Sequence, residues 1–141
     1  MKELRDAILK LTLALPNGAA NATTSPAIDT GASSGGNTAL SGQDGLTEYL
    51  LSVPALTTTQ QPDAKTLKYD IIWADNAALT TNPVTYIAAA ITQTGAGGAG
   101  AAAATFRFRL PSTAKRYVGF KATGSASGDS SAASATLEAL F

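Results

Sequence analysis

Residues 105–123, TFRFRLPSTAKRYVGFKAT, alternate apolar and polar side chains over two runs, and this alternation limits the folds open to the chain. The positions that would share an apolar face are Phe106, Phe108 and Leu110 in the first run, and Val118, Phe120 and Ala122 in the second. A period of two is that of a β-strand, and one apolar face opposite one polar face is typical of a half-buried antiparallel sheet. Because Pro111 cannot continue a central strand, we predict a hairpin turn or a loop between two sheets at the connection.

The rest of the chain carries further short stretches with strand character, separated by turns rich in Gly, Pro and Asn. They cover residues 47–53, 66–74, 84–92, 101–110, 115–123 and 133–140, with a weaker stretch at 26–31. This pattern predicts an all-β fold, a jelly-roll-like antiparallel β-sandwich of about 7–8 strands with long Gly/Ala/Ser-rich loops. We expect residues 17–141 to form this sandwich as a single domain.

Residues 1–16 would precede the sandwich as an N-terminal arm or a short helix. Leu4, Ile8, Leu11 and Leu15 lie at helical spacing, whereas the leucines from position 9 to 15 alternate at strand spacing. Periodicity alone does not decide between helix and strand here. As an arm, residues 1–15 would be removable without unfolding the sandwich, and their loss would weaken contacts between subunits.

The ten basic and ten acidic residues give a formal net charge of zero, so no long-range field would gather nucleic acid or an anionic membrane. No stretch approaches the roughly 20 consecutive apolar residues of a membrane-spanning helix. The chain lacks cysteine and histidine, which removes disulfides, the usual general base and the commonest metal ligand. We therefore expect no enzyme activity, no cofactor and no metal site. Charged residues make up only 14% of the chain, against about 25% in ordinary domains, which suits a protein docked in an assembly.

Two short motifs have both a catalytic or ligand-binding interpretation and a structural one. Asp29-Thr30-Gly31 matches the active-site signature of aspartic proteases, in which two carboxylates share a proton. The simpler interpretation is a strand that ends in a loop, with Asp29 binding turn amides. Residues 95–100, GAGGAG, formally match the dinucleotide-binding glycine pattern, but a strand-like run follows where that motif needs a helix. We predict a hairpin loop there.

Five basic residues in the second half of the chain form a possible basic stripe: Arg107, Arg109, Lys115, Arg116 and Lys121. In a neutral chain, such a stripe is either a solvated sheet face or a face that contacts an acidic protein surface.

Three stretches together carry a resemblance to a known family. They are residues 24–31 (TSPAIDTG), the alternating strand at 67–74, and residues 110–120 with the Gly/Ser loop and the Ala-x-Leu ending at 135–137 that follow. In these stretches, which span roughly residues 20–140, the chain resembles the capsid cement (head decoration) proteins of tailed bacteriophages, the family typified by a short-tailed Bordetella phage. Gly119 departs from the pattern, because a bulkier or charged residue is expected there.

The resemblance implies a jelly-roll β-sandwich that binds the outer surface of the capsid in the virion, after the shell has expanded. It implies the phage major capsid protein as partner, and a homo-oligomer, a dimer or trimer, at two-fold or three-fold positions. Loops 31–45 and 93–104 would be flexible and become ordered on docking. The candidate capsid or subunit contacts are Leu4, Ile8, Leu11, Arg107, Arg109, Lys115 and Arg116.

The alternative from another class is a carbohydrate- or receptor-binding β-sandwich module of a phage fibre or bacterial surface protein. Such a module uses exposed aromatic residues and clustered Asp and Asn side chains in a loop. Asp75, Asn76 and Asn82 are the residues that hint at this function, whereas Trp73 is predicted to be internal.

Overall fold

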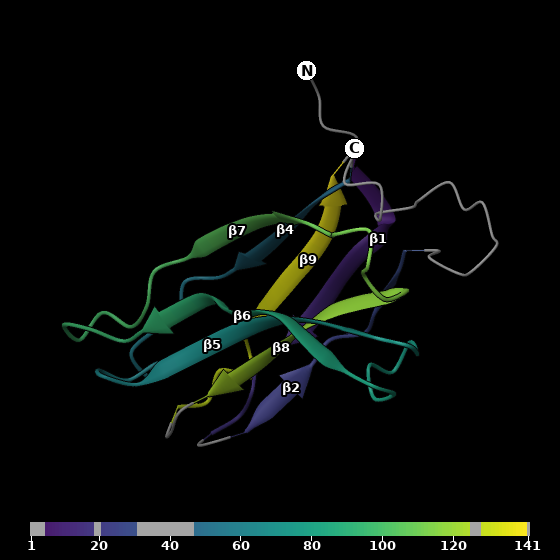
Figure 1. The fold of residues 1–141 in the computed structure, drawn as a ribbon. Coiled ribbons are helices and arrows are strands. Elements are labelled where there is room, and N and C mark those ends of the chain that lie inside the picture. The colour runs from purple at the N-terminus through teal and green to yellow at the C-terminus, as the bar shows by residue number, and fades with distance from the viewer. Residues whose placement is uncertain (1–4, 19–20, 31–46, 125–127, 141) are drawn as a thin grey trace.

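A computed structural model describes residues 5–18, 21–30, 47–124 and 128–140, with the backbone alone described for residues 5–9 (Figure 1). These residues form nine β-strands and no helix. The strands are β1 (Arg5–Ala14), β2 (Ala22–Thr24), β3 (Ile28–Asp29), β4 (Glu48–Val53), β5 (Thr66–Ala74), β6 (Val84–Thr94), β7 (Ala104–Arg109), β8 (Tyr117–Gly124) and β9 (Ser134–Leu140).

The strands make two antiparallel sheets that pack face to face (Figure 1). Sheet I has four strands in the order β1-β9-β4-β7, and sheet II has the order β2-β8-β5-β6 with β3 also paired to β8. Successive strands cross from one sheet to the other, except for the β5–β6 hairpin and for β2 and β3, which both lie along β8. This connectivity is that of a jelly roll, so the predicted all-β, jelly-roll-like sandwich is confirmed. The strand count exceeds the expected one because β2 forms in a segment that showed no strand pattern.

The alternating run at residues 105–123 is divided between the two sheets. Strand β7 pairs with β4 in sheet I, and β8 pairs with β5 in sheet II. The connection through Pro111 is therefore a loop between sheets, the second of the two predicted possibilities. The predicted apolar positions face the core: Phe108, Leu110, Val118, Phe120 and Ala122 are buried, and Phe106 is half-buried.

The N-terminal segment is a strand, and the helical alternative is wrong. Strand β1 pairs antiparallel with β9 at the edge of sheet I. Leu11, Leu13 and Leu15 lie in the main core between the sheets. The strand spacing of these leucines prevails because it presents one apolar face to that core. Residues 10–15 are thus part of the sandwich and do not form a separate arm.

A buried polar pair connects the two sheets inside the core. The Tyr69 hydroxyl of β5 donates a hydrogen bond to Gln93 Oε1 of β6 at 2.7 Å. The Gln93 amide donates to the carbonyl oxygens of Pro54 (2.7 Å) and Ala102 (2.8 Å), which lie after β4 and before β7. Tyr69 is fully buried, and this burial raises its pKa well above the usual value, so the hydroxyl keeps the proton that it donates.

Gly119 lies where the outer face of sheet II is covered by neighbouring segments. A Cβ atom at this position would lie 2.5 Å from Leu79 Cδ1 and 2.6 Å from Ser25 Oγ. Ser25 Oγ accepts a hydrogen bond from the Phe120 amide at 2.9 Å and donates one to the Pro26 carbonyl at 2.7 Å. This close packing explains why the position expected to hold a bulkier residue holds glycine. A second, smaller hydrophobic cluster lies here, outside the main core. It is formed by Ile72, Ala74 and Leu79.

Candidate functional site

The glycine-rich residues 95–100 connect β6 in sheet II to β7 in sheet I. The predicted hairpin is therefore wrong, because the two flanking strands belong to different sheets. Glycine is required here by close approach of the backbone, since a Cβ atom at Gly100 would lie 1.9 Å from the Leu56 carbonyl oxygen. The glycine pattern thus serves the packing of a crossover loop.

The same loop is fixed by side chains from the segment between β4 and β5. The Gly98 amide donates to both carboxylate oxygens of Asp63, at 3.0 and 3.1 Å. Thr58 Oγ1 donates to the Gly98 carbonyl oxygen at 2.7 Å. In a dinucleotide-binding loop, the Gly98 amide would be needed to bind a phosphate. Here it already donates to the Asp63 carboxylate. Gly98, with these bonds to Asp63 and Thr58, lies within the loop 93–104 that was expected to be flexible before docking. The other loop expected to be flexible, 31–45, lies outside the described residues.

Asp29 of the protease-like motif forms a bidentate ion pair with Arg116, with both N···O distances 2.8 Å. Thr30 Oγ1 donates to the Arg116 carbonyl at 2.8 Å, and the Arg116 guanidinium lies 5.2 Å from the Tyr117 ring centroid. Hydrogen bonding to Asp29 raises the pKa of Arg116, so its charge is fixed. The Asp29 carboxylate joins β3 to the start of β8, and both its oxygens contact a permanent cation. The expectation that Asp29 binds turn amides stays a prediction, and the described contact of its carboxylate is with this cation.

A second polar cluster joins the β5–β6 loop to the loop before β8. Asp75 Oδ2 accepts hydrogen bonds from Lys115 Nζ at 3.0 Å and from Asn82 Nδ2 at 2.9 Å. These bonds, first that from Asn82 and then that from Lys115, hold the pKa of Asp75 below its usual range. Lys115 Nζ also donates to the Asn82 carbonyl at 2.7 Å, and Asn76 Oδ1 accepts from the Thr80 amide. Of the side chains that suggested carbohydrate binding, Asp75 and Asn82 are therefore bonded to each other, and Asn76 is bonded to Thr80 of its own loop.

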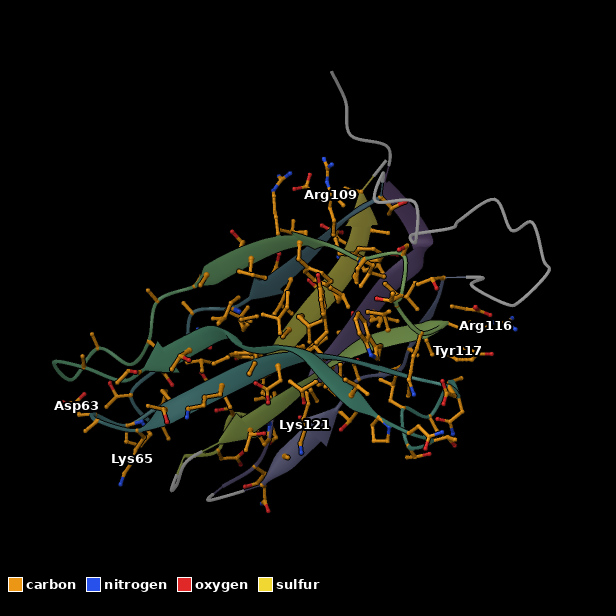
Figure 2. All side chains as sticks on the ribbon, in the orientation of Figure 1. Asp63, Lys65, Arg109, Arg116, Tyr117 and Lys121 are labelled. Atoms are coloured by element: carbon orange, nitrogen blue, oxygen red, sulfur yellow. The ribbon has the colours of Figure 1, made fainter. Side chains whose placement is uncertain are left out.

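The five predicted basic residues do not form one stripe. Figure 2 shows Arg109 on sheet I, Arg116 at one end of the sandwich and Lys121 on sheet II, well apart from one another. Arg107 pairs with Glu48 of the neighbouring strand β4 at 3.5 Å, and Arg109 is exposed on β7. Lys115 and Arg116 also form ion pairs, with Asp75 and Asp29. Three of the five basic residues are thus paired with carboxylates of the described part of the chain.

The apolar contact candidates fall in the N-terminal strand. Leu11 is only 8% exposed and belongs to the main core, so it is not available as a surface contact in this fold. Ile8 lies in β1, and its side chain is outside the described part of the structure. Leu4 also lies outside the described residues. Trp73 is half-buried and stacks on Tyr86 with ring centroids 4.5 Å apart, in line with its predicted internal position.

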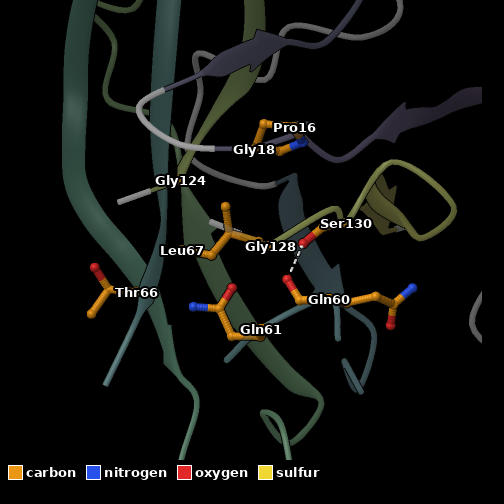
Figure 3. Close-up of a pocket in the computed structure, with 9 residues that line it drawn as sticks. All are labelled: Pro16, Gly18, Gln60, Gln61, Thr66, Leu67, Gly124, Gly128 and Ser130. Carbon is orange, nitrogen blue, oxygen red and sulfur yellow. Dashed lines mark hydrogen bonds between the residues drawn. The ribbon is translucent and has the colours of Figure 1, made fainter. Parts of the chain in front are cut away.

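A small cavity lies where the end of β1, the start of β5 and the β8–β9 loop meet (Figure 3). Its volume is about 10 Å³, which is the space of about one water molecule and far too small for a metabolite. Ser130 Oγ donates to the Gln60 carbonyl at 2.9 Å across its rim. The buried Gln61 Nε2 has no hydrogen-bond partner among the described residues. The cavity is a small packing gap where these segments of the chain meet.

A larger hollow, which we call the outer groove, lies on the outer face of sheet II and has a volume of about 230 Å³. Its lining comes from β2, β5, β6, β8 and the β5–β6 loop: Thr24, Ile72, Leu79, Pro83, Val84, Thr85 and Lys121. Sequence patterns did not reveal it, because its residues are far apart in the chain. Only Lys121 had been singled out, as a member of the basic stripe.

Within the described ranges, no group of three or more acidic, histidine or cysteine residues is placed to hold a metal ion. The same ranges contain no helix long and apolar enough to cross a membrane. Comparison with protein-family models, with curated proteins and with solved structures gave no match. The site therefore has to be interpreted from its own geometry.

Proposed function

We propose that this chain is a non-enzymatic structural protein of a phage virion. It binds the exterior of the capsid as a homo-oligomer, cements neighbouring major capsid proteins and stabilises the expanded head.

The observation that carries the proposal is the spatial arrangement of the stretches that resemble cement proteins. Residues 24–31 include β3, residues 67–74 lie in β5, and residues 116–120 include the start of β8. Strand β3 pairs with β8 on one side and β5 pairs with β8 on the other. Stretches that are separate in sequence thus lie side by side in sheet II, as parts of one structural unit would.

The character of the surface supports the same proposal. Several exposed charges are used in internal pairs, such as Arg116 with Asp29 and Lys115 with Asp75. What remains is a sandwich with a weakly charged surface, which suits many modest contacts on a repeating shell. Many copies, each with several contacts, give strong attachment without a strong single contact.

The test combines light scattering of the purified protein with co-sedimentation on purified expanded heads that lack it. We expect a dimer or trimer that saturates the heads at a fixed number of copies per capsomer and raises their rupture temperature. A monomer that stays in the supernatant at all concentrations would refute the proposal.

The carbohydrate-binding alternative has less support. Of the side chains that favoured it, Asp75 binds Asn82 and Lys115, and Asn76 binds the Thr80 amide, so their hydrogen-bonding groups are already engaged within the chain. A glycan array tests this alternative. The cement proposal expects no signal on the array, whereas a reproducible hit would support carbohydrate binding.

A further inference from the structure

The apolar end of the outer groove is a preformed wall. Val84 is 43% exposed, and it is the one large hydrophobic side chain that the described residues expose to this extent. The loop beside it is fixed by Asn76 Oδ1, which accepts the amides of Thr80 and Thr81, both at 2.9 Å. Leu79 of this loop is buried against the sheet. Because the wall is already ordered, binding against it costs little conformational entropy.

The polar end of the groove offers one cation and two hydroxyl groups. No hydrogen bond or ion pair within the described residues engages the Lys121 ammonium or the Thr24 and Thr85 hydroxyls. Asp70 lies opposite Lys121 on β5, but its carboxylate accepts the Ala89 amide of the β6 bulge at 2.7 Å. Lys121 thus differs from Arg107, Lys115 and Arg116 in that it makes no ion pair within the described residues.

We propose that the outer groove is the docking site for an extended segment of a protein partner. The segment places a carboxylate on Lys121 and an adjacent apolar side chain against Val84. Among the described residues, those that line the groove include Lys121 and no acidic side chain, so the charge of this lining is complementary to an acidic segment. The volume of about 230 Å³ fits side chains rather than a metabolite, whose pockets are typically about 300–1,000 Å³. This inference rests on the proposed function for the identity of the partner, which is then the shell protein.

Two substitutions in the groove and one matched control test the proposal. Lys121→Glu reverses the charge at the polar end, and Val84→Ser removes the apolar anchor. Lys68→Glu makes the same charge change on the outer face of β5, at an exposed position outside the groove. In co-sedimentation with expanded heads, we expect Lys121→Glu to weaken binding about tenfold or more, Val84→Ser to weaken it several-fold and Lys68→Glu to leave it within about twofold. Urea unfolding midpoints equal to that of the wild type confirm that each variant folds.

A second measurement does not depend on heads. A short peptide with alternating Leu and Asp residues is titrated to millimolar concentration into the ¹⁵N-labelled protein. We expect amide shifts at Thr85, Lys121 and their neighbours, which Lys121→Glu abolishes and Lys68→Glu preserves.

The outcomes separate the two proposals. Wild-type protein that binds heads, together with a Lys121→Glu variant that binds them equally well, overturns the groove proposal and leaves the cement function intact. Failure of the wild type on heads removes the cement function, and the peptide titration then decides the groove alone. In that case, peptide shifts scattered over the surface, or none, overturn the groove proposal.

Discussion

Gly119 and Leu79 are in direct contact on the outer face of sheet II, where a Cβ on the glycine would lie 2.5 Å from the leucine Cδ1. We therefore expect Gly119→Ala to destabilise the protein by about 1–3 kcal/mol through overpacking. Neither neighbour moves easily, because Leu79 is buried and Ser25 Oγ is held by the Phe120 amide. Urea unfolding measures the effect.

The control for this substitution lies on the same strand. At Gly124 a Cβ would come no closer than 3.4 Å to another atom, the Gly18 carbonyl oxygen. Gly124→Ala should therefore change stability by less than about 0.5 kcal/mol. Equal losses for the two variants would show that glycine at position 119 serves something other than close packing.

The hydrogen bonds of Gln93 predict a graded loss of stability. Tyr69→Phe removes one donor from the buried network and should cost about 1–2 kcal/mol. Gln93→Met leaves the Tyr69 hydroxyl and the Pro54 and Ala102 carbonyls without their partner, so it should cost about 3 kcal/mol or more. Denaturant unfolding of both variants and of the double mutant gives the coupling. If Gln93→Met proves no worse than Tyr69→Phe, the bonds between the two sheets contribute little.

The Asp75 cluster predicts a dependence of stability on pH. Hydrogen bonds from Asn82 and Lys115 lower the pKa of Asp75 in the folded state, so the carboxylate contributes stability above its unfolded pKa of about 3.9. That contribution is lost as the pH falls from this value through the lower folded pKa. Asp75→Asn should thus be less stable than the wild type at neutral pH, and the difference should shrink as the pH falls below about 4. Unfolding midpoints across this range make the comparison, and a difference that does not vary with pH would contradict the assignment.

Alternation predicted which faces are buried, but it did not predict which strands pair. The apolar sets of β5, β7 and β8 face the core as expected, because a strand with one apolar face has only one way to bury it. The glycine run at 95–100 has the composition of a hairpin turn, and the same residues serve a crossover equally well, so local chemistry could not distinguish the two. The Asp29–Arg116 pair joins residues 87 positions apart, and no local pattern signals such a contact. The outer groove was missed for the same reason, since five segments assemble it.

Strand β1 gives a prediction that reverses the one made from sequence alone. As a removable arm, residues 1–15 would leave a folded sandwich after deletion. In the structure, Leu11, Leu13 and Leu15 are buried in the main core, and β1 hydrogen-bonds along β9. Burying each such leucine contributes about 1.5–3 kcal/mol, which is a large fraction of the stability of a small domain. We therefore expect the deletion to unfold the protein, with loss of the strand signal in circular dichroism.

A milder substitution separates the loss of the core from the loss of chain. Leu13→Ala keeps β1 at full length and should cost about 2–5 kcal/mol, whereas Thr12→Ala, on the exposed face of the same strand, should cost much less. Thr12 and Leu13 are neighbours on β1, and the main difference between them is that Leu13 is buried and Thr12 is exposed. A deletion variant that stays folded, or a Leu13→Ala variant as stable as Thr12→Ala, would show that β1 is dispensable and would restore the arm.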